Sequence, residues 1–218
     1  MRAPASAAQA EHTDPPATRG PAVPVAGSRV VGWVLTVAGA LGLTASLVLT
    51  IEKFSLLADP TYRPSCSINP VISCGSIMSS PQAEAFGFPN PLLGIIGFTV
   101  ALTTGIAVLG GIALPRWYWF GLSAGLIAAT VFVHWLIFQS LYRISALCPY
   151  CMLVWFAVVV SLWYVLLHTA AQVRSSGRPL PGWVRFGARN HTLVLTVWVL
   201  IVGALIAEAF WVYWRTLV

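Results

Sequence analysis

The sequence predicts an all-α integral membrane protein with five membrane-spanning helices. Hydrophobic residues make up 58% of the 218 residues and charged residues only 8%, whereas a soluble domain carries roughly 25% charged residues. Five separate stretches are apolar and long enough to cross a bilayer, which takes about 20 residues in a helix. None of them alternates polar and apolar residues as the strands of a membrane barrel do. This composition excludes a soluble enzyme and a disordered chain.

The predicted spans take up most of the chain. We expect helices at about 30–51, 91–115, 117–142, 149–170 and 193–214. The first apolar run is longer than the core of a signal peptide, which has about 7–15 residues, so we expect it to stay as a membrane helix. Residues 1–28 are rich in Ala and Pro and are expected to form a disordered cytoplasmic tail. The membrane domain then occupies residues 29–218, with segment 52–90 as its one long external loop.

Basic residues are divided unequally between the two sides of this domain. One set of segments holds Arg2, Arg19, Arg29, Arg116, Arg174, Arg178, Arg185 and Arg189. The opposite set holds only Lys53, Arg63, Arg143 and Arg215. Because the side richer in Lys and Arg is normally cytoplasmic, we expect the N-terminus inside the cell and the C-terminus outside the inner (plasma) membrane. The net charge of +6 is scattered and forms no nucleic-acid patch.

Four cysteines form two pairs, and both pairs fall on the predicted extracytoplasmic side. Cys66 and Cys74 lie in the 52–90 loop, whereas Cys148 and Cys151 lie at the start of the fourth span. That compartment is oxidising and permits disulfides. Since the charge count does not involve the cysteines, the agreement indicates that they act outside the cytoplasm.

The sequence Cys148-Pro149-Tyr150-Cys151 has the spacing and the position of a redox-active pair. Pro149 suits the first helical position, which makes Cys148 the N-cap, where the helix dipole and free N–H groups lower a thiol pKa. The i, i+3 spacing puts both sulfurs on one helix face, close enough for a disulfide. Thiol–disulfide exchange passes two electrons through mixed disulfides. Two pairs in series therefore predict a relay, with the loop pair exposed to an external thiol and Cys74 as the shuttle.

Other interpretations of the cysteines remain open from the residues alone. Two structural disulfides in a transporter or channel would use the same positions. A zinc site would need all four thiolates to converge tetrahedrally, and because C-x7-C is an unusual half-site we predict no metal. Four cysteines allow three pairings, so a Cys74–Cys148 bond is also open.

Two ionisable residues lie inside predicted spans, His134 in the third and Glu208 in the fifth. Such residues are functional candidates by default. We expect His134 to be neutral and bonded to a neighbouring helix rather than a proton relay, and Glu208 to reach the interface or pair with a neighbour.

Several motifs around the cysteines occur together in a known membrane family. They are the C-x7-C loop after the first span, Ser73 beside Cys74, the run Phe-Gly-Phe-Pro-Asn-Pro-Leu-Leu-Gly at 86–94, and C-P-Y-C at the fourth span. In these the chain resembles the vitamin K epoxide reductase family, in its bacterial branch, over about residues 30–170. Many bacterial relatives carry a fused thioredoxin-like domain after the fifth span. Because this chain ends at Val218, the resemblance implies a thioredoxin-fold partner on a separate chain.

The resemblance also implies an architecture and residue roles. We expect a four-helix bundle around a quinone, a fifth helix outside the bundle, and a part-helical segment at about 75–88 that caps the quinone pocket. By resemblance, Cys66 receives electrons from the partner, Cys74 passes them to Cys148, and Cys151 faces the quinone.

By the same resemblance, Asn90 hydrogen-bonds a quinone oxygen, and Trp155 stands at the quinone site. From the residues alone, Phe86 and Phe88 are candidates for lining the pocket, with ordinary interface aromatics as the alternative. Animal members carry a tyrosine where this chain has Trp155, a difference that argues against epoxide reduction.

The function expected from these features is that of a quinone-dependent thiol oxidase. It would reoxidise a secreted thioredoxin-fold protein and pass the electrons to menaquinone or ubiquinone, supporting disulfide bond formation. The alternatives are a quinone or quinone-epoxide reductase driven by small thiols, a membrane disulfide isomerase without quinone, and a membrane protein with only structural disulfides.

Overall fold

The computed structural model describes residues 26–175 and 182–215, which are almost entirely helical. Within this part of the chain, five helices are long and apolar enough to span a membrane. They are α1 (Ala26–Ala58), α3 (Pro91–Leu109), α4 (Arg116–Gln139), α5 (Pro149–Ser175) and α7 (His191–Ala209). The prediction of an all-α, multi-pass membrane protein is confirmed. The predicted tail lies, as far as residue 25, outside the described residues.

Shorter elements join these helices. They are α2 (Cys74–Met78), the 3-10 helix η1 (Pro81–Glu84), the π-helical turn η2 (Ser140–Ile144), α6 (Gly182–Arg189) and α8 (Trp211–Arg215). The part-helical segment expected at about 75–88 is therefore present, as α2 and η1. The described residues contain one isolated parallel β-bridge, between Ile72 and Leu147.

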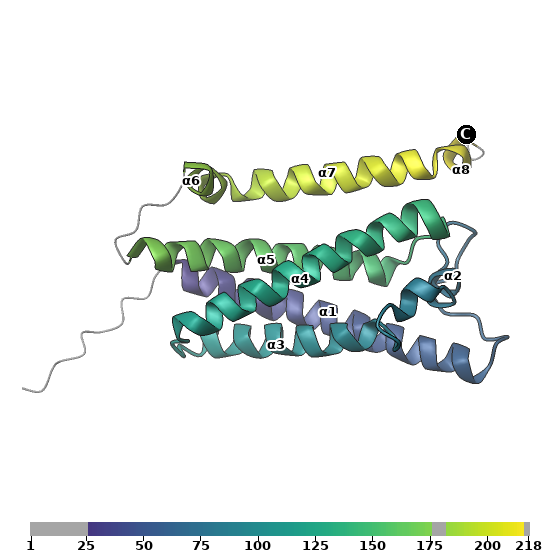
Figure 1. The fold of residues 1–218 in the computed structure, drawn as a ribbon, viewed down its shortest axis with the longest axis horizontal. Helices are drawn as coiled ribbons and strands as arrows, with labels where there is room; N and C mark the ends of the chain where they lie inside the picture. Colours follow the sequence, from purple (N-terminus) through teal and green to yellow (C-terminus); the bar gives the residue numbers. More distant parts are fainter. Residues whose placement is uncertain (1–25, 176–181, 216–218) are drawn as a thin grey trace, which may run out of the picture.

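Four of the long helices form a bundle and the fifth lies outside it. Helix α1 packs against both α3 and α5, and α4 packs against α5. Helix α7 runs along the outside of α5 and α4 (Figure 1), where side chains such as Trp198 and Leu205 touch the core. The expected four-helix bundle with a peripheral fifth helix is confirmed.

Glycines allow the backbones of α1 and α3 to approach closely. A Cβ added at Gly39 would lie 2.6 Å from the backbone N of Leu102, and one added at Gly105 would lie 2.5 Å from the backbone N of Thr36. Lipid tails are as apolar as the side chains, so helices in a membrane associate through close packing of small residues. The α1–α3 pair therefore forms a tight wall on one side of the bundle.

Several helix ends differ from their predicted positions: α5 runs on to Ser175 and α7 ends at Ala209, rather than near 170 and 214. The largest differences are at the ends of α1 and α3. Helix α1 continues beyond Ile51 to Ala58 and includes Glu52 and Lys53, because loop groups bind both charges. Helix α3 ends at Leu109 rather than near 115, because the chain turns at Gly111, where φ is 83°. L-residues with a side chain rarely adopt this left-handed conformation.

Candidate functional site

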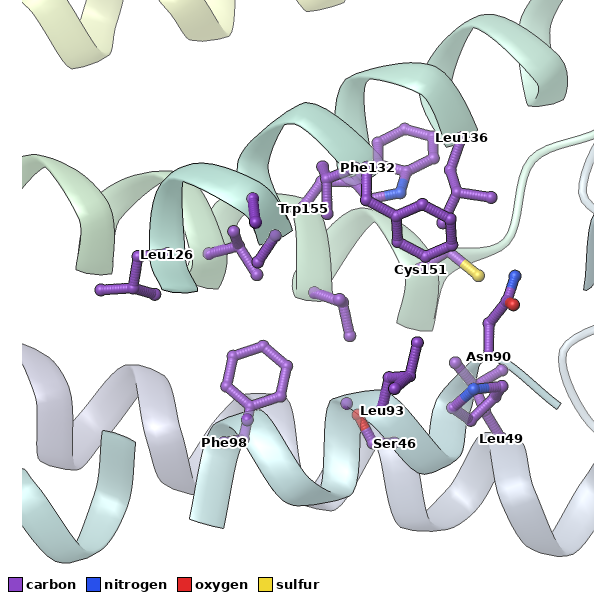
Figure 2. Close-up of a pocket in the computed structure, with 18 of the residues that line it drawn as sticks. Ser46, Leu49, Asn90, Leu93, Phe98, Leu126, Phe132, Leu136, Cys151 and Trp155 are labelled. Atoms are coloured by element: carbon purple, nitrogen blue, oxygen red, sulfur yellow. The ribbon is translucent and has the colours of Figure 1, made fainter. Parts of the chain in front are cut away.

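An apolar cavity of about 710 Å³ lies inside the bundle. Its walls come from α1, α3, α4 and α5, and Figure 2 shows it between α4 and α5 on one side and α1 and α3 on the other. Residues of α2 and η1, among them Ile77, Met78 and Ala83, also line it. The segment that follows Cys74 thus caps the cavity, as expected.

Few polar groups reach this cavity, and three belong to predicted site residues. Cys151, Asn90 and Trp155 all line it, whereas Cys148 does not. The Trp155 side chain is buried in the core, and its indole can only donate a hydrogen bond. An apolar cavity with a few convergent polar groups is typical of a small-molecule site, and an amide, an indole N–H and a thiol suit the carbonyls of a quinone.

The side chain of Asn90 has a structural role as well. Its Nδ2 donates a hydrogen bond to the Gln82 carbonyl oxygen at 2.7 Å, and its Oδ1 accepts one from the Ala85 backbone N–H at 3.2 Å. Asn90 therefore ties η1 to the start of α3. Because an amide NH2 carries two hydrogens, one N–H is left to meet a ligand.

Phe88 does not reach the cavity wall, in contrast to the prediction. The other candidate, Phe86, does line the cavity, and the Phe88 ring stacks on it with centroids 6.3 Å apart. Between the two lies Gly87 with φ of 81°, a left-handed conformation that lets the backbone turn between the two residues.

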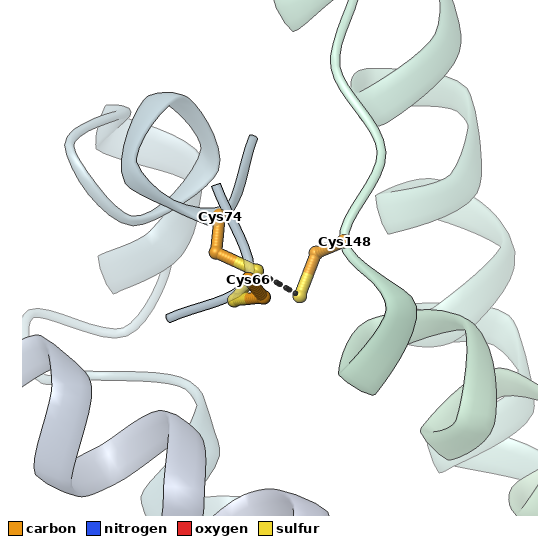
Figure 3. A group of neighbouring side chains, drawn as sticks. All are labelled: Cys66, Cys74 and Cys148. Carbon is orange, nitrogen blue, oxygen red and sulfur yellow. Dashed lines mark hydrogen bonds between the residues drawn. A yellow bond between two sulfur atoms is a disulfide. The ribbon is translucent and has the colours of Figure 1, made fainter. Parts of the chain in front are cut away.

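All four cysteines meet at the capped end of the bundle. Cys66 and Cys74 form a disulfide, whereas Cys148 and Cys151 carry free thiols. The sulfurs of Cys66, Cys74 and Cys148 all lie within 4.8 Å of one another (Figure 3). The loop pair is therefore oxidised and the helix pair reduced, with the two pairs in contact.

The β-bridge sets the register between the two pairs. The Leu147 N–H donates to the Val71 carbonyl oxygen at 2.7 Å, and the Ser73 N–H donates to the Leu147 carbonyl oxygen at 3.0 Å. Cys74 and Cys148 directly follow these residues. Their Sγ atoms consequently lie 3.0 Å apart, so they need to approach by only about 1 Å to form a bond of about 2.05 Å.

Cys148 caps the N-terminus of α5, as predicted. Its carbonyl oxygen accepts from the Met152 N–H at 3.0 Å, and its sulfur accepts from the Cys151 N–H at 3.4 Å. A hydrogen bond from the Cys151 thiol holds the pKa of Cys148 below its usual range, and the backbone N–H groups of Cys151 and Tyr150 act in the same direction against the effect of burial. Cys148 is therefore biased toward the thiolate, the form that attacks disulfides.

The loop pair is not exposed, and this prediction is wrong. The relative exposure of Cys66 is 6%, and that of Cys74 and Cys148 is 0%. Leu49 of α1 and Met78 of α2 pack in the same buried cluster as the three cysteines. The loop folds down onto the end of the bundle, which covers the disulfide.

Two adjacent charged residues of α1 hold the loop in this position. The Glu52 carboxylate accepts hydrogen bonds from the Ser65 hydroxyl at 2.6 Å, the Ser65 N–H at 3.2 Å and the Tyr62 hydroxyl at 3.0 Å. Lys53 Nζ donates to the Met78 carbonyl oxygen at 2.7 Å and pairs with Glu84 at 2.8 Å. Sequence reasoning missed both roles, because their partners lie well downstream in the chain and leave no local signal.

His134 and Glu208 lie away from the cavity wall. The Trp198 indole donates to His134 Nε2 at 3.0 Å, so the proton of the ring lies on Nδ1, which contacts the Thr130 carbonyl oxygen at 2.8 Å. His134 is thus bonded to a neighbouring helix, as expected. The Tyr142 hydroxyl lies 3.5 Å from the Glu208 carboxylate, so Glu208 pairs with a neighbour.

The cluster of three sulfurs does not form a zinc site in this covalent state. Metal ligation by cysteine needs thiolates, and two of the three sulfurs, those of Cys66 and Cys74, are bonded to each other.

Comparison with protein families agrees with this geometry. A model of the vitamin K epoxide reductase family matches residues 33–167. The match covers more than half of the chain and includes all four cysteines, Asn90 and Trp155.

Proposed function

The chain belongs to the vitamin K epoxide reductase family, and from this premise we propose that it is a thiol oxidase that passes electrons from a thioredoxin-fold protein to a membrane quinone. Family membership makes it a membrane thiol–disulfide oxidoreductase. The observation that carries the rest is the 3.0 Å separation of Cys74 and Cys148, with Cys151 at the wall of an apolar cavity. The two cysteine pairs thus form a continuous path from the loop to the cavity.

Electron transfer between the pairs proceeds by two thiol–disulfide exchanges. After the partner reduces the loop pair, the Cys74 thiolate attacks Cys148 of the Cys148–Cys151 disulfide, and Cys151 leaves as a thiolate. The Cys66 thiolate then attacks Cys74, and Cys148 leaves. Two electrons have moved inward, and the products are a Cys66–Cys74 disulfide with two free thiols at Cys148 and Cys151. The structure has this same covalent state.

The cavity residues would hold the acceptor. A quinone, when bound there, accepts two electrons and two protons. The free N–H of Asn90 and the indole N–H of Trp155 would hold its oxygens. Cys151 is the free thiol that lines the cavity. Once the electrons have left, Cys148 and Cys151 are again a disulfide. Menaquinone and ubiquinone both suit an apolar cavity of this size.

The proposed side of the membrane follows from charge and chemistry. The excess of arginine in the opposite segments favours a cytoplasmic N-terminus, which puts the cysteine end outside the cytoplasm. A disulfide in the loop pair suits that oxidising compartment.

Reconstitution tests this function. The purified chain is mixed with a quinone and a reduced thioredoxin-fold protein, and the expected result is thiol-dependent loss of quinone absorbance. Cys66→Ala should stop transfer from the protein donor yet let dithiothreitol reduce the helix pair, whereas Cys151→Ala should stop quinone reduction with either donor. Reshuffling of disulfides in the donor without quinone consumption would instead identify an isomerase.

A further inference from the structure

The two charged residues at the end of α1 hold the redox loop on opposite sides of its disulfide. Lys53 binds Met78 and Glu84, which follow Cys74. Glu52 binds Tyr62 and Ser65, which precede Cys66. The segment before Cys66 is therefore fastened separately from the segment after Cys74.

The hydrogen bonds that the loop donates to the Glu52 carboxylate stabilise its position on the bundle. Glu52 is 6% exposed, and a buried charge is costly unless hydrogen bonds satisfy it. Those hydrogen bonds come from Tyr62 and Ser65, and bonds to a charged group are stronger than neutral ones. The carboxylate therefore favours the closed position of the loop.

Closure of the loop fixes the position of the disulfide. Ser65 is bonded directly to Cys66, and Ser67 on its other side accepts from the Gly75 N–H at 3.2 Å. Holding Ser65 therefore also holds the start of α2 and keeps Cys74 at 3.0 Å from Cys148.

The same closure opposes the entry of electrons. A protein thiol must reach the Cys66 sulfur to attack the loop disulfide, yet Cys66 is 6% exposed. The same contacts thus favour the exchange between Cys74 and Cys148 and disfavour the attack of a partner thiol on Cys66.

We propose that Glu52 is a positioning residue that acts as a latch: it keeps Cys74 against Cys148, and it must release Ser65 and Tyr62 before an external thiol can attack Cys66. This inference rests on the proposed thiol-oxidase function. Glu52 would then slow the attack of an external thiol on Cys66 and speed the exchange between Cys74 and Cys148.

Two cysteine backgrounds separate these steps, and neither needs a quinone. With Cys148→Ser and Cys151→Ser, the full chain keeps only the loop disulfide, and its reduction by reduced thioredoxin or by dithiothreitol measures access to Cys66. With Cys66→Ser and Cys151→Ser, only Cys74 and Cys148 remain, and the rate at which diamide links them measures their proximity.

Glu52→Gln should move the two rates in opposite directions. Loss of hydrogen bonds to a charged group predicts roughly tenfold faster reduction and roughly tenfold slower linking. Ser65→Ala removes the hydroxyl that donates to Glu52 but keeps the backbone N–H. It should therefore speed reduction and slow linking by less than Glu52→Gln does. Glu52→Asp keeps the charge and should fall between wild type and Gln. Asp59→Asn is the matched control, because Asp59 is exposed and its carboxylate accepts hydrogen bonds from Thr61 rather than from Ser65 or Tyr62.

A third readout depends on the charge of Glu52 itself. The titratable groups that act on Cys148 are Cys151 on α5, whose thiol lowers its pKa, and Glu52 on α1, whose charge raises it. In Glu52→Gln the pH midpoint for alkylation of Cys148 should therefore fall, and it should fall further than in Ser65→Ala, which loosens the loop but keeps the Glu52 charge.

The outcomes distinguish the latch from the function on which it rests. Unchanged rates in Glu52→Gln, or two rates that rise or fall together, would overturn the latch. If dithiothreitol but not thioredoxin reduces the wild-type loop disulfide, the proposed protein donor fails, and the dithiothreitol rates still decide whether Glu52 is a latch.

Discussion

A single side chain added inside the cavity should block the quinone without disturbing the fold. Gly97 of α3 lines the cavity, and a Cβ built on it meets no other atom within 4 Å. It lies about two helical turns along α3 from Asn90. The substitution Gly97→Leu therefore adds a branched side chain at the cavity wall, about 10 Å along the helix axis from the proposed quinone oxygen site at Asn90.

The expected size of the effect follows from the limited volume. The cavity measures about 710 Å³, so the leucine side chain competes directly with a bound ring or its tail. Extra atoms in a packed site cost about 1–3 kcal/mol, which corresponds to an affinity about 5- to 150-fold weaker. Titration of the reconstituted variant with quinone should show this as a higher KM.

The matched control is Gly203→Leu on the peripheral helix α7. A Cβ at Gly203 also meets no atom within 4 Å, but Gly203 does not line the cavity. This variant should reduce quinone like the wild type, and both variants should keep thiol exchange between the cysteine pairs. A Gly97→Leu protein with an unchanged KM would refute the assignment of the cavity as the quinone site.

Three further predictions concern the cysteines and the helix contacts. Because the pKa of Cys148 is lowered, its reaction with iodoacetamide should run at full rate above that pKa and slow as the pH falls through it. Cys151→Ala removes the thiol whose hydrogen bond lowers the pKa most, and it should raise the pH midpoint of this reaction. Gly105→Leu puts atoms against the α1 backbone and should destabilise the fold by about 1–3 kcal/mol, seen as a lower Tm in detergent, and an unchanged Tm would contradict the packing. His134→Ala removes the hydrogen bond between α4 and α7 and should cost about 0.6–1.7 kcal/mol of stability, while quinone reduction stays unchanged; a loss of activity at wild-type stability would restore His134 as a proton relay.

The membrane helices could be predicted because each depends on its own stretch of sequence. A run of apolar residues can be recognised locally. The same holds for the start of the fourth span, where Pro149 directly follows Cys148. The end of α1 was less predictable. Glu52 and Lys53 resemble the charges that normally end a membrane span, but here partners from the following loop bind both of them within the helix.

The contacts that bring the site together could not be predicted in the same way. The bridge between Ile72 and Leu147 joins two segments far apart in the chain and has no sequence motif of its own. The burial of Cys66 depends on such contacts too, which is why a polar loop gave the expectation of an exposed disulfide. At Phe86 and Phe88 the deciding factor is the backbone at Gly87, and two phenylalanines in alternation do not show which ring faces the cavity.

The disulfide pattern of the Cys66→Ser protein tests the central claim most directly. Without Cys66, the Cys74 thiolate can still attack Cys148, but the second exchange cannot follow, and Cys151 can release the product only by the reverse step. Peptide mapping by mass spectrometry should then find a Cys74–Cys148 disulfide and a free Cys151. A Cys148–Cys151 disulfide with no detectable Cys74–Cys148 bond after an acid quench would contradict the transfer of electrons from the loop pair to the helix pair.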